Sequence, residues 1–445
     1  MNGLTIMMVL HNEAEYAKLS LQSIRRYADV DNLSVVLVDN HSEDGLSEWA
    51  RAQEDITYVY MDEGMLPFGQ AVNQVCQALS PEDDLLLMDA HYRLTPHALS
   101  RLQDTLYQDD KIGAVGGKSN SFLFYQKEEE TDSYEAAVDQ AGKECAVTGK
   151  QVLSLHYGAV LFRSSALSAL GNLEEALPSQ EYVLADTCFR LIINHWKLYF
   201  CPEAIFWDMR GSGPYHAKNQ SEFELLKQKW GMHYFQTMYN ENILQMITAD
   251  KNAPVSVLEI GCDCGATLLE IHNRYPNAVV CGCEINKHSA NIASHIADVQ
   301  ICNIEEQALT FTPHTFDYII FGDVLEHLHD PLKTIRYCRK FLKAGGCIVA
   351  SIPNLVHISV MEKLLQGDFT YTETGLLDKT HIHLFTYNEI LTMFQEGGYK
   401  ISQIKALTTT LSASQEALLH RLLALQCGAS EFMYQAFWYI VRAQC

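Results

Sequence analysis

The sequence has no apolar run long enough to cross a membrane, no cluster of lysine and arginine, and no charged leader before its first apolar segment. These absences predict a cytoplasmic chain without a transmembrane helix or a signal peptide. Basic residues are also few: 32 lysines and arginines stand against 55 acidic residues, for a formal net charge of -23. Phosphate backbones and anionic membranes require a basic face, so we expect no nucleic-acid partner.

A disulfide framework is missing as well. The 13 cysteines are odd in number and scattered over both halves, which favours reduced thiols. Four of them are expected to lie at the ends of adjacent strands, in a spacing poor for closed tetrahedral zinc: Cys262, Cys264, Cys281 and Cys283. Small buried thiols are the better interpretation. With 445 residues and 48% hydrophobic content, two or three domains with sizeable cores are available.

The segment 257–267, VLEIGCDCGAT, predicts a buried strand, a tight glycine turn and the start of a helix. Gly261 and Gly265 bracket the turn, and Glu259 lies near the end of the strand. A second predicted strand ends about twenty residues later in Glu284, where a carboxylate can bind both hydroxyls of a ribose. Backbone N–H groups of the turn can approach the same ligand. The pattern therefore predicts a site for a nucleotide-like molecule.

Three later segments, at 299–303, 316–328 and 342–354, complete the series. In order, these segments resemble the nucleotide-binding motifs of class I S-adenosylmethionine-dependent methyltransferases over roughly residues 253–445. The resemblance implies S-adenosyl-L-methionine as cofactor, with Glu259 facing its amino end and Asp263 in place of the usual middle glycine, in a turn that aspartate tolerates. The residues implied to bind the cofactor are Glu259, Gly261, Gly265, Glu284, Asn303, Ile304 and Asp323.

Two histidines of this half are candidate catalytic residues. His327 follows the fourth strand, and His381 belongs to a segment that resembles the Asp-x-Thr-His segment of methyltransferases acting on small molecules and sugars. Histidine can accept a hydroxyl proton near neutral pH. Methyl transfer often needs little beyond alignment of the reacting atoms, so a structural role for both remains open. His383 is a third candidate.

The first half alternates predicted strands and helices, which indicates a mostly parallel sheet with ligands at the carboxyl ends of its strands. Its motifs are His11-Asn-Glu13, the turn at 38–45, the segments 69–73 and 88–96, and the segment 158–171. They resemble family-two glycosyltransferases of the GT-A fold over roughly residues 3–215. The resemblance implies that a nucleotide sugar is bound by His11, Asn12, Glu13, Asp39 and Asp89.

The metal motif departs from the pattern of that family, which usually ends the fourth strand with Asp-x-Asp to hold a divalent cation against the diphosphate. This chain has Asp89-Ala-His91. Residues two apart at a strand end point the same way, so Asp89 and His91 can ligate one ion. Imidazole suits Mn²⁺ better than Mg²⁺. A degenerate, metal-free loop is the alternative.

The acidic pair that supplies the catalytic base in the family is also absent. Asp186 is the candidate base that deprotonates the acceptor, and Glu181 is the fallback. A helix cap is the alternative role for Asp186. Asp208 and His216 are weaker candidates for metal or phosphate contacts.

The sequence thus predicts two α/β, Rossmann-like doubly wound domains. The GT-A-like domain covers 1–218, a helical linker covers 219–252, and the methyltransferase domain covers 253–445. The leading hypothesis is a bifunctional enzyme that assembles and methylates a glycan, using a nucleotide sugar, a glycan or glycoprotein acceptor, S-adenosyl-L-methionine, and Mn²⁺ or Mg²⁺. The alternative is a methyltransferase whose degenerate first domain only binds a glycan or a nucleotide.

Overall fold

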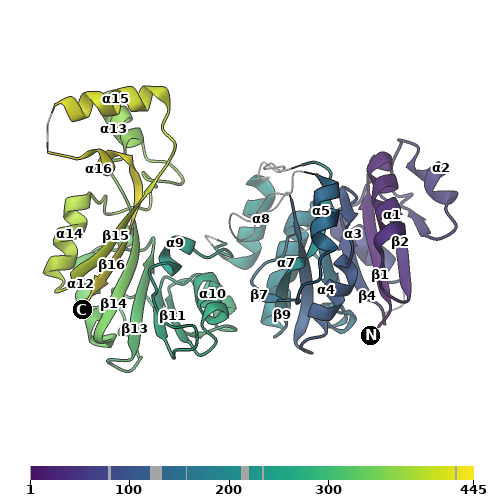
Figure 1. Cartoon of the computed structure of the whole chain (residues 1–445), viewed down its shortest axis with the longest axis horizontal. Helices are drawn as coiled ribbons and strands as arrows, with labels where there is room; N and C mark the ends of the chain where they lie inside the picture. The colour runs from purple at the N-terminus through teal and green to yellow at the C-terminus, as the bar shows by residue number, and fades with distance from the viewer. Residues whose placement is uncertain are drawn as a thin grey trace. The chain divides into compact units, whose positions relative to one another are not determined.

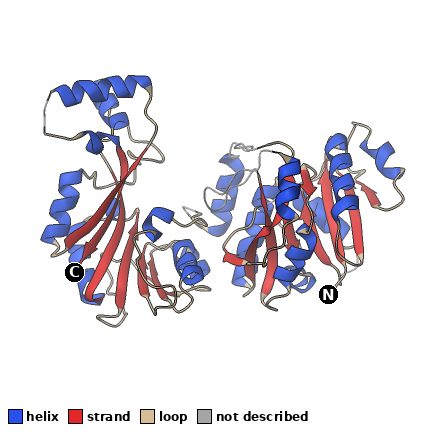
Figure 2. Cartoon of the chain, in the orientation of Figure 1, coloured by secondary structure: helices blue, strands red, loops and turns tan. Residues whose placement is uncertain are grey.

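The computed structural model describes residues 2–78, 82–120, 133–156, 158–211, 220–232, 235–425 and 428–445. Internal contacts divide the chain into two compact units, Met1–Thr237 and Met238–Cys445. Each unit is an α/β sandwich with a sheet between helices (Figure 2). The boundary lies inside the predicted linker, because α8 (Gln220–Trp230) belongs to the first unit and α9 (Glu241–Leu244) to the second. Within the described residues, none of the helices combines the length and the apolar character that a membrane crossing needs.

The sheet of the first unit has the order β3-β2-β1-β4-β8-β6-β9-β5, with β7 paired to β9. Its strands are β1 (Leu4–Leu10), β2 (Leu33–Asp39), β3 (Thr57–Tyr60), β4 (Asp84–Met88), β5 (Tyr92–Leu94), β6 (Ile112–Ser119), β7 (Lys150–Val152), β8 (Ala159–Phe162) and β9 (Lys197–Asp208). The first four strands are parallel, as predicted, whereas β8 runs antiparallel to both β4 and β6. The carboxyl ends of β1, β2 and β4 therefore meet at one edge.

The helices of the first unit are α1 (Ala14–Tyr27), α2 (Leu46–Arg51), α3 (Phe68–Cys76), α4 (Ala98–Leu106), α5 (Tyr134–Ala141), α6 (Ser164–Leu170), α7 (Gln180–Ile193) and α8. Most of them bury one stripe against this sheet, whereas α8 packs against α7. In α1, the buried Ala17, Leu21 and Ile24 recur every three or four residues and join the same core as Leu4 and Ile6 of β1.

The sheet of the second unit has the order β12-β11-β10-β13-β14-β16-β15. Its strands are β10 (Ser256–Ile260), β11 (Val279–Glu284), β12 (Asp298–Ile301), β13 (Phe316–Gly322), β14 (Leu342–Pro353), β15 (Lys400–Thr408) and β16 (Ala436–Gln444). All pairs are parallel except those of β16. Val257 and Leu258 of β10 enter cores on opposite faces, as a doubly wound sheet requires. The predicted fold class is confirmed.

The helices of the second unit include a separate helical cluster. The helices are α9, α10 (Ala266–Arg274), α11 (Lys287–Ala293), η1 (Leu325–His327), α12 (Pro331–Cys338), η2 (Arg339–Phe341), α13 (Ile358–Leu365), α14 (Tyr387–Glu396), α15 (Ala413–Ala424) and α16 (Glu431–Gln435). Figure 1 shows α13 and α15 side by side beyond the sheet, and Ile358, Leu419 and Tyr434 form their small core. The last strand, β16, begins at Ala436, directly after α16.

Candidate active sites

The turn between β10 and α10 has a backbone that favours glycine. Gly261 and Gly265 have φ angles of 72° and 87°, and Asp263 has a φ of 43°. Aspartate is one of the few residues with a side chain that tolerates positive φ, so Asp263 adopts the conformation that the prediction requires. A Cβ at Gly261 would lie 2.6 Å from the Cγ2 of Val324, so this position also lacks room for a side chain.

Glu284 joins this turn to the next strand. One carboxylate oxygen accepts a hydrogen bond from the backbone N–H of Asp263 at 2.9 Å, and the other accepts from the N–H of Asn286 at 2.7 Å. Burial raises the pKa of Glu284, against the lowering effect of these two N–H groups. Each oxygen keeps lone-pair capacity for one more donor. Two backbone N–H groups thus hold Glu284, the predicted ribose ligand, at the end of β11. This strand end lies next to the switch point of the sheet, where β10 has β11 on one side and β13 on the other.

Glu259 is buried near the end of β10, with 4% of its surface exposed. Its Oε2 has no hydrogen-bond partner among the described residues. Burial raises the pKa of Glu259 to about 8; the Thr267 hydroxyl lowers it, and the negative charges of Glu284 and Asp263 raise it further. An unpartnered buried carboxylate is costly to the fold, and it fits a cationic group of a ligand, such as the amino end of a methionine moiety.

The other predicted cofactor residues also lie at the carboxyl ends of strands. Asn303 follows β12, and its side-chain oxygen accepts from the N–H of Glu305 at 3.1 Å. The neighbouring Ile304 packs against the core below the sheet's edge. Asp323 follows β13 with a φ of 54°, and its N–H donates to the hydroxyl of Ser351 at 2.9 Å. The predicted cofactor residues therefore lie at the carboxyl ends of four parallel strands, β10 to β13, on one edge of the sheet.

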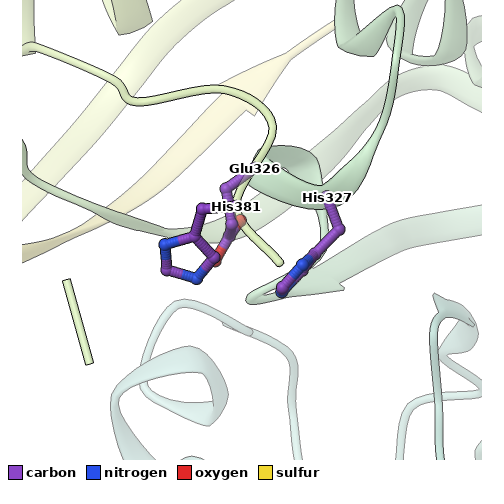
Figure 3. A group of neighbouring side chains, drawn as sticks. All are labelled: Glu326, His327 and His381. Atoms are coloured by element: carbon purple, nitrogen blue, oxygen red, sulfur yellow. The ribbon is translucent and has the colours of Figure 1, made fainter. Parts of the chain in front are cut away.

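Glu326, His327 and His381 form a cluster just beyond β13, and Figure 3 shows their side chains together. The ring centroids of the two histidines lie 4.9 Å apart at 68°. His327 Nδ1 lies 3.1 Å from the carbonyl oxygen of Thr380, and His381 Nδ1 lies 3.2 Å from that of Leu376. A carbonyl only accepts, so both Nδ1 atoms carry hydrogen, and in the neutral rings each Nε2 carries the lone pair. Burial lowers the pKa of His381, which favours this neutral form.

Glu326 is the member of this cluster that sequence reasoning did not select. It is 1% exposed, and its Oε2 has no partner within the described residues. The Glu-His dipeptide directly after a strand end was the signal available in the sequence. The third candidate, His383, is oriented differently: its Nε2 lies 3.1 Å from the carbonyl oxygen of His329.

In the first unit, the end of β1 meets the turn after β2. His11 Nδ1 lies 3.0 Å from the carbonyl oxygen of Asn40, and Asn12 accepts from the N–H of Glu43 at 2.8 Å with a φ of 57°. Asp39 is fully buried and accepts from the Ser42 N–H and from the hydroxyls of Ser47 and Tyr58. Burial opposes ionisation of Asp39, but these donors hold its pKa below the usual value. In this arrangement Asp39 organises the turn.

Asp89 and His91 lie together, as predicted, in a cluster with Arg210. Asp89 Oδ1 lies 2.8 Å from His91 Nδ1, and Glu13 Oε1 lies 3.7 Å from the same nitrogen. Arg210 Nη1 is 3.5 Å from Asp89 Oδ2, and its Nε and Nη2 donate to Asp208 at 2.9 Å each. Burial alone would raise the pKa of Asp89, but His91 and Arg210 hold it below the usual value. A guanidinium thus already pairs with the predicted metal ligand.

Arg210 was missed by sequence reasoning, although it stands two residues after the candidate Asp208. Another weak candidate, His216, lies outside the described residues.

Asp186, the candidate base, lies inside α7 and is fully buried. Its Oδ1 accepts from Trp230 Nε1 at 2.9 Å and from Lys229 Nζ at 2.7 Å, both near the end of α8. Arg190, one turn further along α7, approaches Oδ2 to 3.8 Å. The alternative of a helix cap is wrong, because α7 begins six residues earlier, at Gln180. Helix α8 covers this carboxylate, and a catalytic role for it stays a prediction.

Two family models match this chain. The model described as "Glycosyl transferase family 2" matches residues 5–170, and "Methyltransferase domain" matches residues 232–404. A ubiquinone biosynthesis O-methyltransferase of Neisseria meningitidis serogroup A is 24% identical over 212 residues, which are 44% of this chain and 88% of that protein. A protein of the same name from Coxiella burnetii is 29% identical over 149 residues, covering 32% of this chain and 62% of its own.

Two solved structures are similar to parts of this chain. A mannosyltransferase from Pyrobaculum calidifontis in complex with GDP-Man and Mn²⁺ has a TM-score of 0.38 and 19% identity; the match covers 48% of this chain and 59% of the mannosyltransferase. A putative methyltransferase from Bacillus halodurans has a TM-score of 0.33 and 12% identity, with 46% of this chain and 96% of that chain covered.

Proposed function

We propose that this chain, a transferase in which a family 2 glycosyl transferase domain precedes a methyltransferase domain, both transfers a sugar and methylates a hydroxyl in glycan biosynthesis. The observation that carries the proposal is the pair Glu259 and Glu284, held around one positive-φ turn at the switch point of the second sheet. In the first domain, the donor is a nucleotide sugar. We further propose a surface polysaccharide or a glycoprotein as acceptor, in the cytoplasm.

When bound, S-adenosyl-L-methionine supplies a methyl group made electrophilic by its sulfonium. The residues present fit this molecule. Glu259 offers an unpartnered buried carboxylate to its ammonium, and Glu284 offers both oxygens to the ribose hydroxyls. The carbonyl oxygen of the Asn303 side chain can accept from the adenine amino group. We assign Asp323, which follows β13, to a position beside the methyl donor.

The methyl acceptor is proposed to be a hydroxyl oxygen, which is consistent with the similarity to proteins named as O-methyltransferases. Such an acceptor must lose a proton as its oxygen reacts. The groups of this chain available to activate it are the two Nε2 lone pairs of His327 and His381, next to the Glu326 carboxylate.

In the first domain, we assign Asp89 and His91 to a divalent cation, Mn²⁺ or Mg²⁺, that neutralises the diphosphate of the nucleotide sugar. An ion held by both side chains would replace their 2.8 Å hydrogen bond. His11, Asn12 and Glu13 would then contact the nucleotide at the adjacent strand end. Asp186 remains the candidate base and Glu181 the fallback.

A second function is favoured by two contacts. Arg210 already pairs with Asp89, and Lys229 and Trp230 already bind Asp186. In each contact, a basic or indole N–H group occupies a carboxylate that was predicted to act, Asp89 as a metal ligand and Asp186 as the base. They support a methyltransferase whose first domain serves only to bind a glycan or a nucleotide.

One experiment distinguishes the bifunctional enzyme from the methyltransferase with a binding-only first domain. Binding of S-adenosylhomocysteine to the full chain is measured by calorimetry, and nucleotide sugars are screened by thermal shift with Mn²⁺ or chelator. A ligand at 100 times its Kd should stabilise its domain by about 2.7 kcal/mol. Glu389→Gln, an exposed carboxylate of α14, is the control variant. Failure of S-adenosylhomocysteine to bind overturns the methyltransferase assignment, and nucleotide-sugar binding without transfer or hydrolysis supports the second function.

A further inference from the structure

We propose that Glu326, His327 and His381 bind a divalent transition-metal cation, and that this cation holds and acidifies the hydroxyl that is methylated. Each residue offers one possible ligand atom, a ring nitrogen or a carboxylate oxygen, and these three atoms all lie within 4.8 Å of one another. The role assigned to the cation rests on the methyltransferase function proposed above, whereas its binding does not.

The first support is the state of the two imidazoles. Backbone carbonyls of Thr380 and Leu376 accept from the Nδ1–H groups of His327 and His381. These bonds fix the tautomer and leave each Nε2 as a neutral donor atom. Metal-bound histidines characteristically have this second bond, which orients the ring and increases its basicity.

The second support is Glu326. A carboxylate at 1% exposure with an unpartnered Oε2 is expensive unless a cation or a donor satisfies it. Its main chain ties the two halves of the cluster together, because the N–H groups of Ile382 and His383 both donate to the Glu326 carbonyl, at 2.8 and 2.9 Å. The segment that carries His381 is thereby held against η1. Figure 3 shows the carboxylate beside the His381 ring, with His327 opposite.

The third support is local charge. Asp323 and Asp378 lie close enough to both histidines to interact with them electrostatically. In the part of the chain that the structure describes, no lysine or arginine forms an ion pair with these two aspartates or with Glu326. Three carboxyl groups without a basic partner favour a divalent cation.

The ligand set determines which cation the site is expected to bind. Two imidazole nitrogens and one carboxylate suit Zn²⁺, Co²⁺, Fe²⁺ and Mn²⁺, whereas Mg²⁺ and Ca²⁺ prefer oxygen ligands. Three protein ligands leave positions open, as in catalytic and not in structural zinc sites. One open position accepts the hydroxyl of the acceptor.

A cation at this position lowers the pKa of the bound hydroxyl. Because the cation then occupies both Nε2 lone pairs, it takes the place of the histidines in activating the hydroxyl, whose proton passes to solvent. The resulting oxyanion attacks the methyl carbon. The new O–C bond forms as the C–S bond breaks, and its electron pair stays on sulfur, which leaves a neutral thioether. Atoms and charges balance without an oxidant or a reductant.

The test counts Zn²⁺ on the full chain. Wild type, Glu326→Gln, His381→Ala and Asp89→Ala are dialysed against chelator-buffered Zn²⁺, and bound metal is measured by mass spectrometry. His329→Ala is the matched control, since this neighbouring histidine has an exposed side chain that pairs with Glu305. Loss of one of three ligands should weaken Zn²⁺ binding at least about tenfold. Mutation of a residue that only hydrogen-bonds to a metal ligand already weakens metal affinity by about this factor.

We expect Glu326→Gln and His381→Ala each to bind one equivalent of Zn²⁺ less than wild type. His329→Ala and Asp89→Ala should retain this equivalent. If Glu326→Gln does not fold, as judged by circular dichroism, the half-exposed His381→Ala decides. Equal zinc in wild type and His381→Ala, or no zinc in wild type, overturns the proposal. S-adenosylhomocysteine binding is measured on the same samples. Binding without zinc refutes only the cation site, whereas zinc without S-adenosylhomocysteine binding refutes only the methyltransferase function.

Discussion

The buried carboxyl of Glu259 gives a sharp prediction about cofactor binding and pH. With a pKa of about 8, this group is mostly protonated in the free protein at pH 7. A cofactor ammonium favours the ionised form, so binding must first remove the proton. We therefore expect S-adenosylhomocysteine to bind more tightly as the pH rises from 6 to 8, and Glu259→Gln to abolish this dependence.

The magnitude follows from the difference between pH and pKa. Ionising the group costs about 1.4 kcal/mol at pH 7 and roughly twice that at pH 6, at 1.36 kcal/mol per pH unit. Affinity should rise about fiftyfold between pH 6 and pH 8. Each cofactor bound at pH 7 should release roughly 0.9 of a proton to the buffer. The lost charge-assisted bond should cost Glu259→Gln about 1.5–3 kcal/mol at pH 8 and little at pH 6.

Calorimetry in two buffers of different ionisation enthalpy measures both the affinity and the proton release. Glu389→Gln serves as the control, because it removes an exposed carboxylate of α14 and leaves the turn intact. An affinity for wild type that stays flat from pH 6 to 8, with no proton released, would refute the assignment of Glu259 to the ammonium.

The free protein offers an independent check on the same group. The folded-state pKa of Glu259 lies above its ordinary value of 4.5, so between 4.5 and 8 the folded chain holds more protons than the unfolded chain. The group therefore destabilises the fold increasingly as pH rises through this window. Relative to wild type, Glu259→Gln should gain on the order of 3 kcal/mol of unfolding free energy between pH 5 and pH 8, measured by urea denaturation of the second unit.

Three further outcomes are expected. Glu284→Ala should weaken S-adenosylhomocysteine by about 1.5–3 kcal/mol in calorimetry, because it loses charge-assisted bonds to the ribose, and unchanged affinity in a folded variant contradicts the ribose role. Asp89→Ala should abolish any gain in nucleotide-sugar affinity from Mn²⁺. If Arg210 supplies the counter-charge instead, wild type should bind the nucleotide sugar equally well with Mn²⁺ and with chelator, and Arg210→Met should bind it weakly under both conditions. Asp186→Asn should reduce sugar transfer about 10²–10⁴-fold without changing nucleotide affinity, and full activity would direct attention to Glu181.

The fold of both halves could be predicted because it depends on local patterns. The apolar runs at Leu4–Leu10 and Ser256–Ile260 are long enough to indicate buried strands, and glycines mark the turn that follows the second. The positive φ of Asp263 also follows from residue chemistry alone. What local patterns missed is the antiparallel β8 between β4 and β6, since pairing partners distant in sequence leave no periodicity to detect.

The candidate sites were predictable where one strand end carries the residue, and not where distant segments meet. Glu326 and His381 are 55 positions apart, and hydrogen bonds between η1 and the 376–383 segment bring them together. Arg210 reaches Asp89 because β9 ends near β5 and β4, a pairing that sequence spacing cannot show. Likewise, nothing in the sequence around Asp186 indicates that α8 covers it.

These long-range contacts differ in what they imply for the two domains. In the second, they leave acidic groups without partners: Glu259 and Glu326 each have a buried oxygen that no described donor reaches. In the first, they pair the acidic groups, Asp89 with Arg210 and Asp186 with Lys229, although Asp186 Oδ2, 3.8 Å from Arg190, also has no hydrogen-bond partner among the described residues. Unpaired buried carboxylates destabilise a fold and persist where a ligand satisfies them. If Asp186 is the base of sugar transfer, Lys229 must release it when the acceptor binds, whereas Glu259 and Glu326 each already have an oxygen without a described partner.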